Sequence, residues 1–154
     1  LTPSIELYSM GGLTSWQTYR PLTNLQSMAI SFAGPLAGFL AGGIVLWSLR
    51  YLPPQPSIYL QYAVADWLWV NFGWGLINLV PILPLDGGNI MRSAVQAVRG
   101  RRDEILPRKI SIVFGCGLIV LAVLNRFYFG AVIAGMITYS NYAALRDPGG
   151  RPHL

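Results

Sequence analysis

The sequence predicts an all-α polytopic membrane protein with about four transmembrane helices and a short N-terminal segment that resembles a β-hairpin. Its 154 residues are 53% hydrophobic and only 11% charged, whereas charged residues make up about 25% of a typical soluble domain. Residues 28–49 contain no charged side chain, and a helix of that length spans the roughly 30 Å of bilayer hydrocarbon. Two further apolar stretches, 63–85 and 110–144, are interrupted only by Asp66 and by Asn125–Arg126.

Residues 1–27 are predicted to form a membrane-associated strand and turn. Polar and apolar residues alternate from Ser4 to Tyr8, Gly11–Gly12 interrupts the run, and residues 13–18 can supply the second strand. Residues 28–91 then form the core transmembrane helices. Pro35 fits best in the first turn of its helix, where a missing N–H costs little.

Basic residues fix the expected orientation. They crowd the connection 92–109, which is predicted to be cytoplasmic because positive loops face the cytoplasm. Residues 110–145 then form a helical hairpin that turns outside at Asn125–Arg126, and residues 146–154 form a flexible cytoplasmic tail. This clustering also excludes nucleic-acid binding as the reason for the net charge of +5. The basic residues of the connection are Arg92, Arg99, Arg101, Arg102, Arg108 and Lys109.

Two kinds of residue favour helix packing over chemistry. Gly34, Gly38 and Gly42 recur every four residues and therefore line one helix face, where small residues let a second helix approach closely. Cys116 is the only cysteine, so it forms no intrachain disulfide, and its apolar neighbours favour inert packing.

Asp86 is the strongest candidate for a functional residue. No Lys, Arg or His lies between residues 63 and 90 to neutralise it, and a charge inside a membrane normally has a partner or a function. One interpretation is that Asp86 caps the amphipathic helix that follows it. The other is a site, because Pro81 and Pro84 break the preceding helix beside Asn78 and free backbone carbonyls there.

Residues 78–88 closely resemble the N-x-x-P-x-x-P-L-D-G-G block of the site-2 protease family of intramembrane zinc metalloproteases. Two further blocks match in the order of that family. Residues 5–12 resemble the segment after the zinc-binding helix, and residues 31–38 resemble an A-G-P-L-A-N block, with Gly38 where Asn is usual.

The resemblance implies that Asp86 is the third zinc ligand, with the other ligands and a general-base Glu on an upstream H-E-x-x-H helix. Zinc lowers the pKa of bound water to about 7 and polarises the scissile carbonyl. Asn78 would orient the substrate or stabilise the oxyanion, and Pro84, Gly87 and Gly88 would support the site. The implied partners are transmembrane protein substrates and the lipid bilayer, in a prokaryotic cytoplasmic membrane.

The H-E-x-x-H helix is absent from this sequence, and the only histidine, His153, lies in the polar tail. We therefore expect a piece of a longer enzyme with an incomplete Zn²⁺ site, no catalytic residue of its own and no hydrolysis by this chain alone. The alternatives are a non-catalytic scaffold or pseudoprotease that binds transmembrane helices, and a transporter subunit that uses Asp86 as an ion relay.

Overall fold

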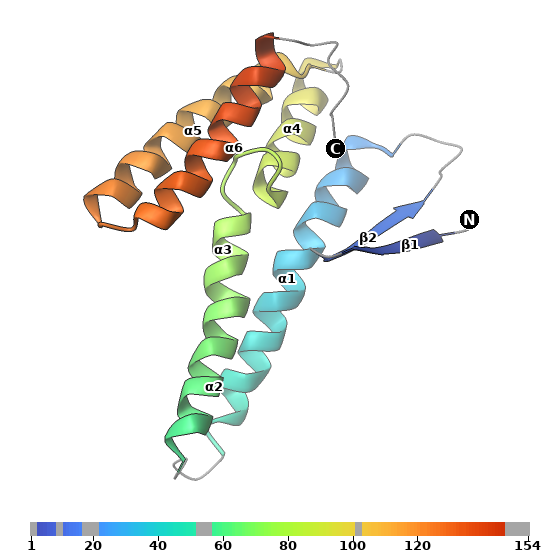
Figure 1. The fold of residues 1–154 in the computed structure, drawn as a ribbon. Helices are drawn as coiled ribbons and strands as arrows, with labels where there is room; N and C mark the ends of the chain where they lie inside the picture. The colour runs from blue at the N-terminus through green and yellow to red at the C-terminus, as the bar shows by residue number, and fades with distance from the viewer. Residues whose placement is uncertain (1–2, 9–10, 17–21, 52–56, 101–102, 147–154) are drawn as a thin grey trace.

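The computed structural model describes residues 3–8, 11–16, 22–51, 57–100 and 103–146. Strand β1 (Pro3–Tyr8) pairs antiparallel with β2 (Gly11–Trp16), and the register places Tyr8 opposite Gly11. Helices make up the rest of the described architecture (Figure 1). The tail predicted at residues 146–154, His153 included, lies outside the described residues after Arg146.

Helix α1 (Asn24–Ser48) starts earlier than the apolar pattern predicts because a capping box fixes its first turn. The Gln26 N–H donates to the Thr23 hydroxyl at 3.2 Å, and the Thr23 N–H donates to the Gln26 side chain at 3.0 Å. The expectation that Pro35 lies in the first turn is therefore wrong. Pro35 is buried inside α1 and gives no N–H to the preceding turn.

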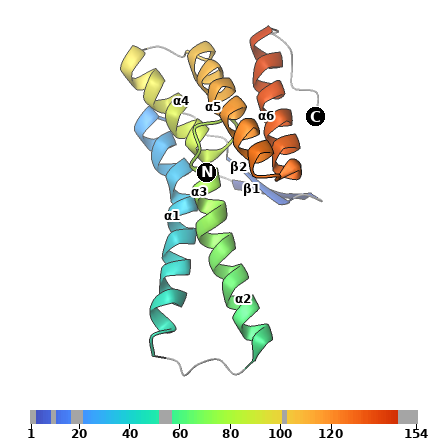
Figure 2. The ribbon, with the colours of Figure 1, turned by 90° about the vertical axis from the view of Figure 1, so that its left-hand side faces the viewer.

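The second apolar stretch forms one rod of three consecutive segments (Figures 1 and 2). They are α2 (Ile58–Leu68), the π-helical segment η1 (Trp69–Gly73) and α3 (Trp74–Asn78). The rod packs along α1 through aromatic rings that occupy the space left by glycines on the facing helix. A Cβ on Gly42 would lie 2.6 Å from the Phe72 ring, and one on Gly75 would lie 2.7 Å from the Phe39 ring. The two rings stack with centroids 6.0 Å apart.

After an irregular turn at residues 79–85, α4 (Asp86–Arg99) begins the return. Gly100 ends this helix in the left-handed conformation, with φ of 63°, which glycine adopts without steric cost. Helices α5 (Ile105–Leu124) and α6 (Tyr128–Arg146) form an antiparallel hairpin whose turn contains Arg126 at φ 58°. Most of the basic connection 92–109 is thus helical, as the last part of α4 and the first turn of α5.

Asp103 organises the junction between α4 and α5. Its Oδ1 accepts hydrogen bonds from the N–H groups of Ile105 (3.0 Å) and Leu106 (3.2 Å), and its other oxygen pairs with Arg99. The hydrogen bond from Leu106, together with Arg99 and Ile105, lowers the pKa of Asp103 below its ordinary value of 3.8, although burial opposes the shift. The carboxylate therefore acts as the cap of α5.

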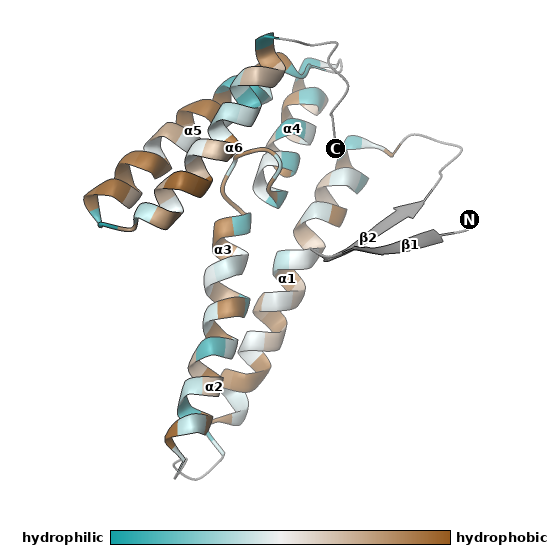
Figure 3. Cartoon of the chain, in the orientation of Figure 1, coloured by the Kyte–Doolittle hydropathy of each residue, from teal (hydrophilic) through white to brown (hydrophobic). Residues whose placement is uncertain are grey.

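Hydropathy is distributed as expected for a protein in lipid. Within the described residues, two helices, α1 and α5, are long and apolar enough to cross a membrane. Figure 3 shows apolar residues along much of α5 and the lower part of α6, whereas hydrophilic residues gather along α4 and at the junction that leads to α5. Cys116 is exposed on α5, one of the two candidate membrane spans, and its inert packing in an apolar setting stays a prediction.

Candidate functional site

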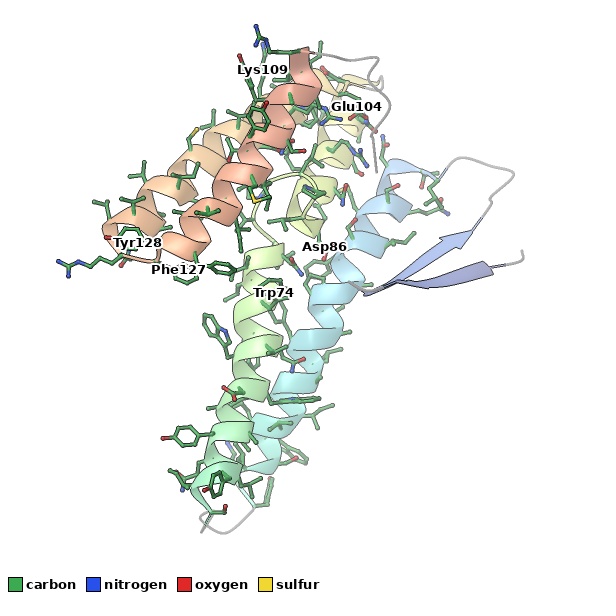
Figure 4. All side chains as sticks on the ribbon, in the orientation of Figure 1. Trp74, Asp86, Glu104, Lys109, Phe127 and Tyr128 are labelled. Carbon is green, nitrogen blue, oxygen red and sulfur yellow. The ribbon has the colours of Figure 1, made fainter. Side chains whose placement is uncertain are left out.

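Asp86 occupies the first position of α4, between α4 and α1 (Figure 4). Leu85, in an extended conformation, is the N-cap residue, and no side chain caps the helix. The interpretation of Asp86 as the helix cap is therefore wrong. The carboxylate instead lies at the positive end of the helix dipole, which favours its negative charge.

The carboxylate of Asp86 faces a glycine of the block at residues 31–38. A Cβ on Gly34 of α1 would lie 3.7 Å from the Asp86 Oδ2, so a larger side chain would contact or cover the carboxylate. Asp86 is half-buried, and within the described part of the chain it makes no ion pair or hydrogen bond through its side chain. It is thus positioned by the backbone and left available for a ligand.

Gly87 and Gly88 allow the first turn of α4 to lie directly on the preceding turn. A Cβ on Gly87 would overlap the Leu79 carbonyl and lie 2.6 Å from the Val80 oxygen. A Cβ on Gly88 would lie 2.5 Å from both the Ile82 oxygen and the Leu83 nitrogen. Any side chain at these two positions would therefore displace backbone and not only a flexible neighbour.

The turn at residues 79–85 is well satisfied, although it contains two prolines. Each N–H it possesses has an acceptor: those of Leu79 and Val80 bond to α3, and those of Ile82 and Leu85 bond within the turn. Ile82 and Leu83 are buried, at 2% and 7% exposure. These hydrogen bonds are needed because a buried peptide group without a partner costs free energy.

Two of the carbonyls that the sequence suggests are free at the helix break are in fact occupied. The Asn89 side chain donates to the Pro84 oxygen at 3.2 Å, and the Asn141 side chain donates to the Leu83 oxygen at 2.6 Å. Pro84 itself is exposed and follows a cis peptide bond. The idea that freed carbonyls join Asp86 in a site is therefore wrong for these two groups.

Asn78 ends α3 and is half-buried, at the other end of the turn from Asp86. Its side chain makes no hydrogen bond to any residue in the described ranges. The turn thus holds an uncommitted amide and an uncommitted carboxylate at its two ends, while the N–H groups between them are all hydrogen-bonded.

Sequence reasoning missed Ser111 and Asn141, the two residues that hold this turn from the side. The Ser111 hydroxyl of α5 accepts a hydrogen bond from the Leu83 N–H at 3.0 Å, and the Asn141 side chain of α6 donates one to the Leu83 carbonyl. Their exposures are 0% and 2%. The available signal was polarity, since each is a polar residue in an otherwise apolar stretch.

The three glycines of α1 that are spaced four residues apart face different partners along one side of the helix. Gly34 faces Asp86, a Cβ on Gly38 would lie 3.3 Å from the Asn71 oxygen, and Gly42 accommodates Phe72. Asn71 lies in η1 and donates to the Trp67 carbonyl at 2.8 Å. Small residues thus bring α1 close to both the rod and the start of α4.

The donor set fits one ligand of a metal site and not a complete one. In the ranges that the structure describes, no three His, Cys, Asp or Glu side chains come together. A catalytic zinc site requires three protein ligands, so Asp86 would need partners from outside these residues.

Comparisons with known proteins place this chain near zinc metalloproteases. A family model described as Peptidase family M50 matches residues 55–124. A protein of Synechocystis named "Putative zinc metalloprotease sll0528" is 30% identical over 78% of this chain and 31% of its own length. Another from Mycobacterium tuberculosis, named "Putative zinc metalloprotease Rip3", is 32% identical over 94% of this chain and 38% of its own length.

The fold matches a solved structure, the site-2 protease from Methanocaldococcus jannaschii, with a TM-score of 0.56 and 21% identity. The match covers 92% of this chain and 63% of the archaeal one. The chain spans about a third of the length of the curated relatives, at 31% and 38%. The family match over residues 55–124, the relatives named as zinc metalloproteases and the fold shared with a site-2 protease together support the resemblance to the site-2 protease family of zinc metalloproteases.

Proposed function

We propose that this chain contributes the LDG-motif portion of an intramembrane zinc metalloprotease that hydrolyses peptide bonds within transmembrane segments of substrate proteins. One observation carries the proposal: the Asp86 carboxylate is fixed at the contact of α1 and α4, at a helix N-terminus, with no partner among the described residues. An intramembrane acid without a partner is by default a hypothesis for a functional site, and Asp86, unlike the exposed Asp66, is half-buried at a contact between two helices.

In this proposal Asp86 is one zinc ligand, and the remaining ligands come from residues outside the described ranges. Zinc at such a site would polarise the scissile carbonyl. The amide of Asn78, which is uncommitted in the described chain, would orient the substrate or donate to the developing oxyanion. Gly87, Gly88 and Pro84 would maintain the turn that separates these two side chains.

The proposed membrane arrangement has four spans: α1, the rod of residues 58–78, α5 and α6. The rod has 21 residues by its printed bounds, which corresponds to roughly 30 Å of helix. The α4–α5 junction would face the cytoplasm of a prokaryotic cell because Arg99, Arg108 and Lys109 lie there. The strands β1 and β2 would lie at the membrane surface, where an unwound substrate could add as a further strand.

Cleavage of a reporter transmembrane helix by the full-length protein in detergent or liposomes tests the proposal. Asp86→Ala should abolish cleavage and reduce bound zinc. Asp66→Ala is the matched control, because Asp66 is an exposed acid on α2 and should retain both. Wild-type cleavage and zinc content in Asp86→Ala would show that Asp86 is not a ligand.

A non-catalytic scaffold or pseudoprotease is the alternative, favoured only by the absence of an H-E-x-x-H sequence from these residues. The same reporter helix distinguishes the two. A scaffold would retain the helix through purification and never cut it, and Asp86→Ala would leave that binding unchanged.

A further inference from the structure

The two consecutive peptide groups that flank the Leu83 Cα, together named the Leu83 peptide, are both held by the C-terminal hairpin. The Leu83 N–H donates to Ser111 Oγ of α5 at 3.0 Å, and the Leu83 carbonyl accepts from Asn141 Nδ2 of α6 at 2.6 Å. These contacts join residues 28 and 58 positions apart in the chain. Because all three residues are buried, water cannot replace either hydrogen bond.

This peptide in turn supports the start of α4. The Leu83 nitrogen lies where a Cβ on Gly88 would be 2.5 Å away, so peptide and helix are in direct contact. The Leu85 N–H donates to the Ile82 carbonyl at 2.8 Å, which closes the turn immediately before Asp86. A shift of the Leu83 peptide would therefore move the first turn of α4 and the carboxylate with it.

The orientation of Asn141 is fixed by its acceptors. Its Nδ2 donates to the Ile137 carbonyl at 2.9 Å as well as to Leu83, so an inverted amide would set its oxygen against two carbonyls. Its Oδ1 is buried and has no partner within the described residues. An apolar residue would avoid this unpaired oxygen, so the feature that favours asparagine here is the bond to Leu83.

We propose that Ser111 and Asn141 are positioning residues that hold Asp86 in place through the Leu83 peptide. The inference rests on the proposed function, in which Asp86 is a zinc ligand. It gives the C-terminal hairpin, which lies outside the LDG motif, a role in the site. Residues that orient a metal ligand from behind typically change metal affinity or activity by about 10–100-fold when removed.

Hydrogen exchange of the full-length protein tests the link without any metal. A fragment covering residues 80–85 has few amides because Pro81 and Pro84 lack an N–H, so the Leu83 amide can be followed. Ser111→Ala and Asn141→Leu should each accelerate its exchange by about 10-fold or more. Thr138→Ala is the matched control, since Thr138 is buried on α6 but bonds only to Ala134 of its own helix.

The same variants are then assayed for zinc affinity and for cleavage of the reporter helix. We expect Ser111→Ala and Asn141→Leu to lower zinc affinity and kcat by about 10–100-fold while KM changes little. Unchanged exchange within α5 and α6 would show that the hairpin remains folded. If both variants exchange, bind zinc and cleave like Thr138→Ala, the inference is wrong even where Asp86→Ala is inactive. An active Asp86→Ala would instead overturn the proposed function.

Discussion

Gly88→Ala tests whether close backbone contact positions Asp86. The added methyl would lie 2.5 Å from the Ile82 oxygen and 2.5 Å from the Leu83 nitrogen. Optimal separations for such contacts are about 3.5 Å, so the first turn of α4 must withdraw by roughly 1 Å. Neither neighbour can rotate away, because both are backbone atoms of a buried turn.

Two magnitudes follow from that displacement. Overpacking of this kind destabilises a protein by about 1–3 kcal/mol. A misplacement of about 1 Å at a reacting centre can lower the rate by about 100-fold. We therefore expect the loss of cleavage to exceed what the loss of folded protein explains.

The assay compares reporter cleavage, zinc content and thermal unfolding of the full-length protein with those of Gly43→Ala. Apart from its own helix turn, no atom of the described residues lies within 4 Å of a Cβ placed on Gly43 in helix α1. This control should therefore be neutral or stabilised by up to about 1 kcal/mol through helix propensity. Wild-type stability and cleavage in Gly88→Ala would refute the reasoning.

Two further changes test the frame around the site. Gly42→Ala should lower the melting temperature, because its methyl would lie 2.6 Å from the Phe72 ring, which stacks on Phe39. Gly43→Ala is again the control, and equal melting temperatures of the two variants would contradict this packing. The folded-state pKa of Asp103 is depressed, so its cap should stabilise the start of α5 fully above pH 3.8 and lose that effect as the pH falls through the lowered pKa. The protection of the Leu106 amide against hydrogen exchange measures the strength of this cap. Asp103→Asn should remove the pH dependence of that protection, whereas persistence of the same pH dependence would assign it to another group.

The sequence alone was sufficient for the features that depend on local pattern. Uncharged length predicted the apolar helices, and Asn125–Arg126 marked the break between α5 and α6 because two polar residues interrupt an apolar run. The LDG block identified the family from residue types at fixed spacing. These inferences succeed because hydropathy and short motifs are local properties of the chain.

Other features depended on individual hydrogen bonds and backbone geometry that hydropathy alone does not show. A capping box starts α1 earlier in the chain than the apolar pattern predicted. Asp86 follows the N-cap residue of α4, whereas the sequence pattern suggested that Asp86 itself was the cap. Two carbonyls of the proline-containing turn, which were expected to be free, are bound by Asn89 and Asn141. For the start of α1 and for these carbonyls, a side-chain hydrogen bond decided the outcome.

The sequence by itself determined the apolar helices and the resemblance to the site-2 protease family, and it singled out Asp86 as the candidate functional acid. Only the tertiary structure showed that Gly34 of α1 faces that carboxylate and that Ser111 and Asn141 hold the turn before it. The physical reason is the range of the interactions. Apolar patterning and motif spacing are fixed within a few residues, whereas the Leu83 peptide is satisfied by groups 28 and 58 positions away, and such pairings exist only after the helices have packed.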